Sequence, residues 1–149
     1  MFMQRLRLLL PALWAGLLLC IALIATPAPF AVLATADAGR VVGRIFAQEA
    51  YLSLVLGVLV LLLERQAAQQ ASEAGRGSVF SAEVVLALGT LFCTVAGYFA
   101  LQPMMAAARA GQGGASFALL HGVSLGFFAL KGLLVLALAW RRSATATAA

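Results

Sequence analysis

Four long apolar stretches constrain this chain more than any other feature of its sequence. They cover residues 8–26, 45–63, 82–102 and 117–140. Each approaches the roughly 20 residues that an α-helix needs to cross about 30 Å of hydrocarbon. Because backbone polar groups in lipid must bond within their own segment, such stretches predict transmembrane helices. The predicted fold is an all-α, polytopic membrane protein with a four-transmembrane-helix bundle.

Composition supports one membrane domain. The chain is 64% hydrophobic and 10% charged, which is too apolar for a water-soluble domain of 149 residues. No connection between the stretches is long enough for a core of its own, so we expect a single domain over residues 1–142. The Ala-rich residues 143–149 lack an apolar run and are expected to form a disordered cytoplasmic tail.

The net charge of +5 indicates membrane topology rather than nucleic-acid binding. Basic residues gather at the ends of the predicted helices and do not form a patch with aromatic residues. Connections that are cytoplasmic if the N-terminus is inside hold Arg5, Arg7, Arg65, Arg76, Arg141 and Arg142. The opposite side holds Arg40, Arg44 and Arg109. The positive-inside rule therefore favours a bacterial inner-membrane protein with both termini in the cytoplasm.

The first apolar stretch also resembles a secretory signal. A short basic segment precedes it, and small residues follow near Pro27. The apolar run is longer than the roughly 7–15 residues of a cleaved signal. Bulky Leu19 before Cys20 departs from a lipoprotein signal. We therefore predict an uncleaved first helix.

Prolines and a serine mark the expected helix ends. Pro27 and Pro29 are expected to end the first helix, and Pro103 the third. Ser81 is placed to cap the start of the third helix. Residues 37–44 have a helical pattern that leads directly into the second stretch.

Small and polar residues form stripes at helical spacing, and such stripes face other helices in membranes. The stripe on the third stretch consists of Glu83, Ala87, Thr90, Thr94 and Gly97. The stripe on the second consists of Gly39, Gly43, Glu49, Ala50, Ser53 and Gly57. The stripe on the fourth consists of His121, Ser124, Phe128 and Lys131. We expect these three faces to point into the bundle.

Glycines are predicted to provide close helix contacts. The expected packing residues are Gly39, Gly43, Gly97, Gly122 and Gly126, four of which form two GxxxG motifs. We favour close packing within the chain over a dimer seam. On the fourth helix we place Val135 on the lipid-facing side.

A polar cluster is predicted where the second and fourth helices reach the outer side. Glu49 and His121 are expected at similar depth and in contact, with Gln48, Gln102 and Ser124 nearby. One interpretation is an outward-opening site for a proton, metal or small cation. The favoured alternative is a structural cluster that pins the two helices together.

Two further pairs of residues lie within the apolar stretches or at their ends. Lys131 is costly near mid-membrane, and an ion pair with Glu83 would satisfy it. Cys20 and Cys93 are expected at matching depth, and we favour small apolar fillers over a thiol metal site.

Recognised catalytic motifs are absent from the sequence. It has no phosphate-binding glycine loop, no nucleophile elbow and no second His for metal or haem chemistry. The prediction is a non-enzyme without a cofactor, and haem or copper handling is a weaker idea that the single His opposes.

The start of the last stretch carries a family resemblance. The segment Leu120-His121-Gly122-Val123-Ser124, the entry into the second stretch over residues 39–46, and the four spans resemble the transmembrane-protein-205-like family. Its bacterial members are grouped as a domain of unknown function (domain 4149). Relatives often place Asn two turns after that His, where this chain has Phe128. The resemblance implies an integral membrane protein without an established chemistry.

Two functional hypotheses follow. The leading one is a structural or accessory membrane protein, surrounded by the lipid bilayer, that packs against a second copy or a membrane-protein partner and not against nucleic acid. The alternative is a small transporter or ion-handling protein that uses Glu49 and His121.

Overall fold

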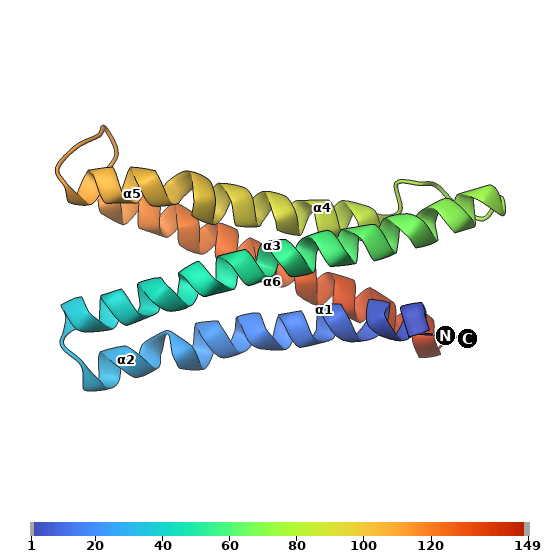
Figure 1. Cartoon of the computed structure of the whole chain (residues 1–149), viewed down its shortest axis with the longest axis horizontal. Helices are drawn as coiled ribbons and strands as arrows, with labels where there is room; N and C mark the ends of the chain where they lie inside the picture. The colour runs from blue at the N-terminus through green and yellow to red at the C-terminus, as the bar shows by residue number, and fades with distance from the viewer. Residues whose placement is uncertain (1, 148–149) are drawn as a thin grey trace.

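A computed structural model describes residues 2–147, which form helices and turns without a strand (Figure 1). The first pair of spans consists of α1 (Phe2–Cys20), the π-helix η1 (Ile21–Ala25), α2 (Pro27–Val32) and α3 (Thr35–Glu73). The second pair consists of α4 (Ala82–Thr94), the π-helix η2 (Val95–Ala100), α5 (Leu101–Arg109) and α6 (Phe117–Thr147). In this part of the chain, four helical spans are long and apolar enough to cross a membrane, as predicted.

The helix starts follow local sequence signals. Ser81 caps α4, and its hydroxyl accepts a hydrogen bond from the Val84 amide at 3.3 Å. Residues 37–44 are helical and continue into the second span as part of α3. Beyond the end of α3 the chain turns at Gly75, whose φ of 68° is a left-handed value that suits glycine. The predicted Ser81 cap and the predicted helical residues 37–44 are confirmed.

The expected helix ends at the prolines are wrong. The first span continues past Pro27 and Pro29 to Val32, and the third continues past Pro103 to Arg109. In both spans a π-helix, η1 or η2, lies just before the proline-containing helix. A proline lacks an amide proton and clashes with the carbonyl four residues earlier. The wider π turn changes the backbone spacing there, so the chain bends and continues instead of stopping.

The four spans form two antiparallel hairpins with both termini at one end of the molecule (Figure 1). Helix α6 packs against α1 and α4, while α3 packs against α1 and α4. At the other end, α2 lies against α3, and α5 lies against α6. The α2–α3 pair and the α5–α6 pair diverge toward that end, which we call the open end (Figure 1).

The hydrophobic core lies between the open end and the termini. It is formed by Trp14, Ala15, Leu18, Val60, Ala87, Val135 and Leu138. Val135 is fully buried, so its predicted lipid-facing position is wrong. The predicted inward stripe of the third span is confirmed, because Glu83, Ala87, Thr90, Thr94 and Gly97 are all buried.

Large apolar side chains cover much of the outer surface, including Leu13, Leu23, Val55, Phe92 and Leu133. Such a surface suits a lipid environment and would be costly in water. The chain is therefore a membrane protein with a four-helix bundle. The predicted disordered tail differs in part, because α6 continues through residues 143–147. Residues 148–149 lie outside the described part of the chain.

Candidate functional site: a crevice at the open end

A cavity of about 390 Å³ lies between the diverging helices, and we call it the crevice. Its α2–α3 side is lined by Thr26, Phe30, Thr35, Gly39, Val42, Gly43, Phe46 and Glu49. Its α4–α5 side is lined by Cys93, Thr94, Gly97, Tyr98, Gln102, Met105 and Arg109. Its α6 side is lined by Phe117, His121, Ser124, Leu125, Phe128 and Lys131. The volume lies within the range of small-molecule sites.

A buried ion pair forms the floor of the crevice. The Lys131 ammonium lies 2.6 Å from Oε1 of Glu49, and both side chains are at most 4% exposed. The Ser53 hydroxyl donates to the same carboxylate oxygen and accepts a 3.0 Å hydrogen bond from the Trp14 indole. The Lys131 ammonium also lies 5.1 Å from the centre of the Phe128 ring. The pair thus joins α3 to α6, and Trp14 extends the chain of polar contacts to α1.

The predicted Lys131–Glu83 pair is not formed. Glu83 instead pairs with Arg141 at 3.0 Å, and Arg142 lies 3.6 Å away. Lys131 is ten residues before Arg141 on α6, which is about 15 Å along a helix. Glu83 stands at the first turn of α4, near the chain termini, and so meets the end of α6 rather than its middle.

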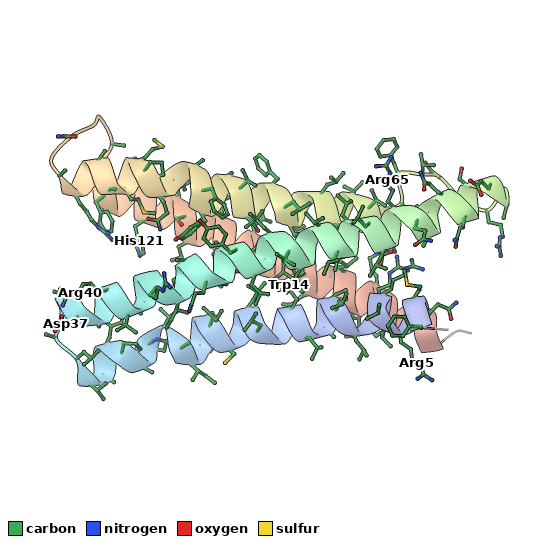
Figure 2. The ribbon with its side chains drawn as sticks, in the orientation of Figure 1. Arg5, Trp14, Asp37, Arg40, Arg65 and His121 are labelled. Carbon is green, nitrogen blue, oxygen red and sulfur yellow. The ribbon has the colours of Figure 1, made fainter. Side chains whose placement is uncertain are left out.

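The predicted contact between Glu49 and His121 is not formed either. Helix α3 begins at Thr35, ten residues before the apolar stretch that was used to estimate depth. Glu49 is therefore about 21 Å into its helix, whereas His121 is only about 6 Å into α6. His121 lies toward the same end of the molecule as Asp37 and Arg40 (Figure 2). Both residues line the crevice, but at opposite depths.

At the mouth of the crevice, the Phe117 ring contacts both His121 and Arg109. The His121 and Phe117 rings are nearly parallel, with centroids 5.7 Å apart. The Arg109 guanidinium lies 4.4 Å from the centre of the same Phe117 ring. His121 is exposed, and Gln102 on the neighbouring helix α5 is half-buried. Gln48 is exposed and does not line the crevice, so it does not belong to the predicted polar cluster.

Ser124 and one of the five predicted packing glycines contact a neighbouring helix, and the other four glycines do not. Ser124 donates a 2.7 Å hydrogen bond to the carbonyl of Gly97. A Cβ at Gly97 would lie 2.4 Å from Cβ of Phe127, so this glycine provides a close helix approach. Open space surrounds the Cβ positions of the other four predicted packing glycines, which are Gly39, Gly43, Gly122 and Gly126.

The positions of these four glycines explain why they make no close helix contact. Gly39 and Gly43 line the crevice, where α3 has separated from the second hairpin. Gly122 and Gly126 are exposed on the far side of α6 from Ser124. Close packing of these four glycines within the chain was therefore a wrong prediction.

A second polar cluster closes the bundle at the end that holds the termini, and we call it the arginine clamp. Glu64 is 1% exposed and pairs with Arg7 at 2.8 Å and with Arg142. Arg142 lies 3.6 Å from Glu83, which pairs with Arg141. The clamp joins α1, α3, α4 and α6. Sequence analysis missed it, although a carboxylate at the inner end of an apolar helix signals a partner.

The two cysteines, expected at matching depth as small apolar fillers, lie in different surroundings. Cys20 is exposed on α1, while Cys93 is buried on α4 and lines the crevice. Within residues 2–147, no three His, Cys, Asp or Glu side chains form a group that could hold a metal ion.

Comparison with known proteins identifies a family. Residues 9–113 match the family model described as "Domain of unknown function (DUF4149)". No curated protein and no solved structure matches the chain. The matched range ends before the 120–124 segment, so the wider transmembrane-protein-205-like name stays a resemblance. Because the match covers well over half of the 149 residues, the chain belongs to the family of domain of unknown function DUF4149.

Proposed function

We propose that this chain is a small ligand-handling protein of the bacterial inner membrane, not an enzyme, that takes a small molecule into the crevice. The crevice is the observation that carries the proposal. It combines mainly apolar and aromatic walls with a few polar groups that point into it, a combination typical of ligand sites. This is the transporter-like alternative of the sequence analysis, with Lys131 in place of His121 as the partner of Glu49.

The floor of the crevice supports a binding role. Lys131 and Glu49 both line the crevice, so their charges are within reach of a bound molecule. Intramembrane ionisable residues are costly and mark functional sites by default. Beyond the pair lies the core around Trp14, Val60 and Leu138. In this arrangement a molecule enters from the open end and stops at the ion pair.

Orientation is part of the proposal. Arg5, Arg7, Arg65, Arg76, Arg141 and Arg142 lie on the side of the termini, against Arg40, Arg44 and Arg109 at the open end. This bias favours cytoplasmic termini and a crevice that opens to the periplasmic side.

Cysteine labelling tests access to the crevice. The experiment uses Ser124→Cys in a chain with Cys20→Ala and Cys93→Ala, reconstituted in nanodiscs. A small uncharged thiol reagent should label position 124, which is half-buried on the crevice wall. The matched control is Thr90→Cys, because Thr90 is fully buried and does not line the crevice. Equally slow labelling at both positions would contradict the proposal.

A structural or accessory role is a second candidate. Gly122 and Gly126 are exposed on α6 with open space around them. A GxxxG face of this kind favours close approach of another transmembrane helix, from a second copy or a membrane-protein partner. Crosslinking at Val123→Cys, beside these glycines, tests this role, since a specific partner would give one discrete product.

A further inference from the structure

We propose that the molecule taken into the crevice is an amphipathic anion, with an acidic headgroup at Arg109 and an apolar body between the aromatic walls. The inference rests on the proposed function and names the chemical class of its ligand. Three observations lead to it: the charges that line the crevice, the placement of their partners, and the chemistry of the walls between them.

The crevice has an excess of positive charge. Its lining includes the cations Lys131 and Arg109 but only one carboxylate, Glu49. Lys131 is neutralised at the floor, where its ammonium lies 2.6 Å from that carboxylate. A ligand cation would meet this excess charge, and an anion would compensate it.

Arg109 is the cation that remains at the mouth. Among the described residues no carboxylate pairs with it, and its guanidinium lies against the Phe117 ring. The ring supplies no hydrogen-bond acceptor in the ring plane, so the guanidinium N–H groups stay available for an acidic acceptor. Arginine binds carboxylate and phosphate groups in this planar geometry. An acidic headgroup is the matching ligand group.

The space between mouth and floor has mainly apolar walls. Its walls include Phe30, Val42, Phe46, Leu125 and Phe128, from α2, α3 and α6. From His121 to Lys131 the crevice follows ten residues of α6, which is about 15 Å. An alkyl or aromatic body fits this length, whereas a small inorganic anion at Arg109 would leave the walls uncovered. The inferred ligand is therefore amphipathic rather than a simple ion.

Protection of the Ser124→Cys label tests the headgroup. In nanodiscs of zwitterionic lipid, decanoate should slow labelling by the uncharged reagent several-fold more than decanol or decyltrimethylammonium at equal concentration. Arg109→Gln should raise the half-protecting decanoate concentration by about tenfold, because one charge-assisted contact is lost. Arg109→Lys should retain part of the protection. Arg40→Gln is the matched control, since Arg40 is exposed at the same end but does not line the crevice.

The outcomes separate the inference from the proposed function. If position 124 is labelled but decanol protects as well as decanoate, or Arg109→Gln changes nothing, the acidic headgroup is refuted while the crevice stands. If position 124 is not labelled even without additive, the proposed function itself fails. Nanodiscs with phosphatidylglycerol distinguish the source: slower labelling there, reversed by Arg109→Gln, identifies a bilayer lipid, and unchanged labelling identifies a free amphiphile.

Discussion

The partner of Lys131 shows how residue-level energetics shape this bundle. A lone lysine inside a membrane protein is costly, and removing one member of a buried pair leaves the other charge uncompensated. Here the lysine is held by Glu49, with Ser53 bonded to the same carboxylate oxygen. The pair therefore links α3 of the first hairpin to α6 of the second, at the floor of the crevice.

A double-mutant cycle tests this link. Glu49→Leu and Lys131→Met should each lower the free energy of unfolding by about 3–5 kcal/mol, and the double variant should cost much less than their sum. Thermal unfolding in nanodiscs measures the effect. A parallel cycle of Glu49→Leu with His121→Ala should be additive, because these residues are not in contact. Additive costs for the Glu49–Lys131 cycle would refute the pair.

Single glycines should differ sharply in tolerance. Gly97→Ala should lower the free energy of unfolding by about 1–3 kcal/mol, because the new Cβ would overlap with Phe127. Gly122→Ala should be neutral or stabilise the helix by up to about 1 kcal/mol, because its Cβ meets open space. The two variants make a matched pair in one stability assay. Equal costs would contradict the placement of the two glycines.

At the scale of helices, periodicity predicted most of what is observed. The stripe from Glu83 to Gly97 is buried as predicted. This prediction succeeded because it depends only on the spacing of residues along one helix. The partners of Glu49 and Lys131 were mispredicted because pairing depends on the relative depth of two helices. The depth of Glu49 was counted from Ile45, where the apolar stretch begins, whereas α3 itself begins at Thr35. The crevice was likewise unpredictable, since it arises from the divergence of two hairpins.

The arginine clamp links four helices at the end that holds the termini. Glu64→Gln should lower the free energy of unfolding by several kcal/mol, because it leaves Arg7 and Arg142 without their buried carboxylate. Asp37→Asn is the control, since Asp37 forms an exposed pair with Arg40 that is worth at most about 1 kcal/mol. Thermal unfolding of both variants checks the comparison. A Glu64→Gln cost no larger than the control would show that the clamp does not hold the bundle.

At the scale of the whole molecule, the two ends differ: the arginine clamp closes one end, and the crevice opens the other. The end with the termini is tied by ion pairs across four helices, and the open end contains the crevice. Each hairpin also has one span with a π-helix before its proline-containing segment, η1 before α2 and η2 before α5. These interruptions lie where the spans approach the open end, so the bends associated with them affect the walls of the crevice and not the clamped end.

The final prediction is the direction of the molecule in the membrane. An even number of spans places both termini on one side, and the arginine bias predicts that this side is the cytoplasm. Gly113→Cys, in the α5–α6 loop, should react with a membrane-impermeant maleimide in intact cells. Arg76→Cys, in the α3–α4 connection, should react only after the membrane is opened. The background for both is Cys20→Ala with Cys93→Ala. The reverse pattern would place the crevice mouth in the cytoplasm, and labelling of both sites in intact cells would refute a single orientation.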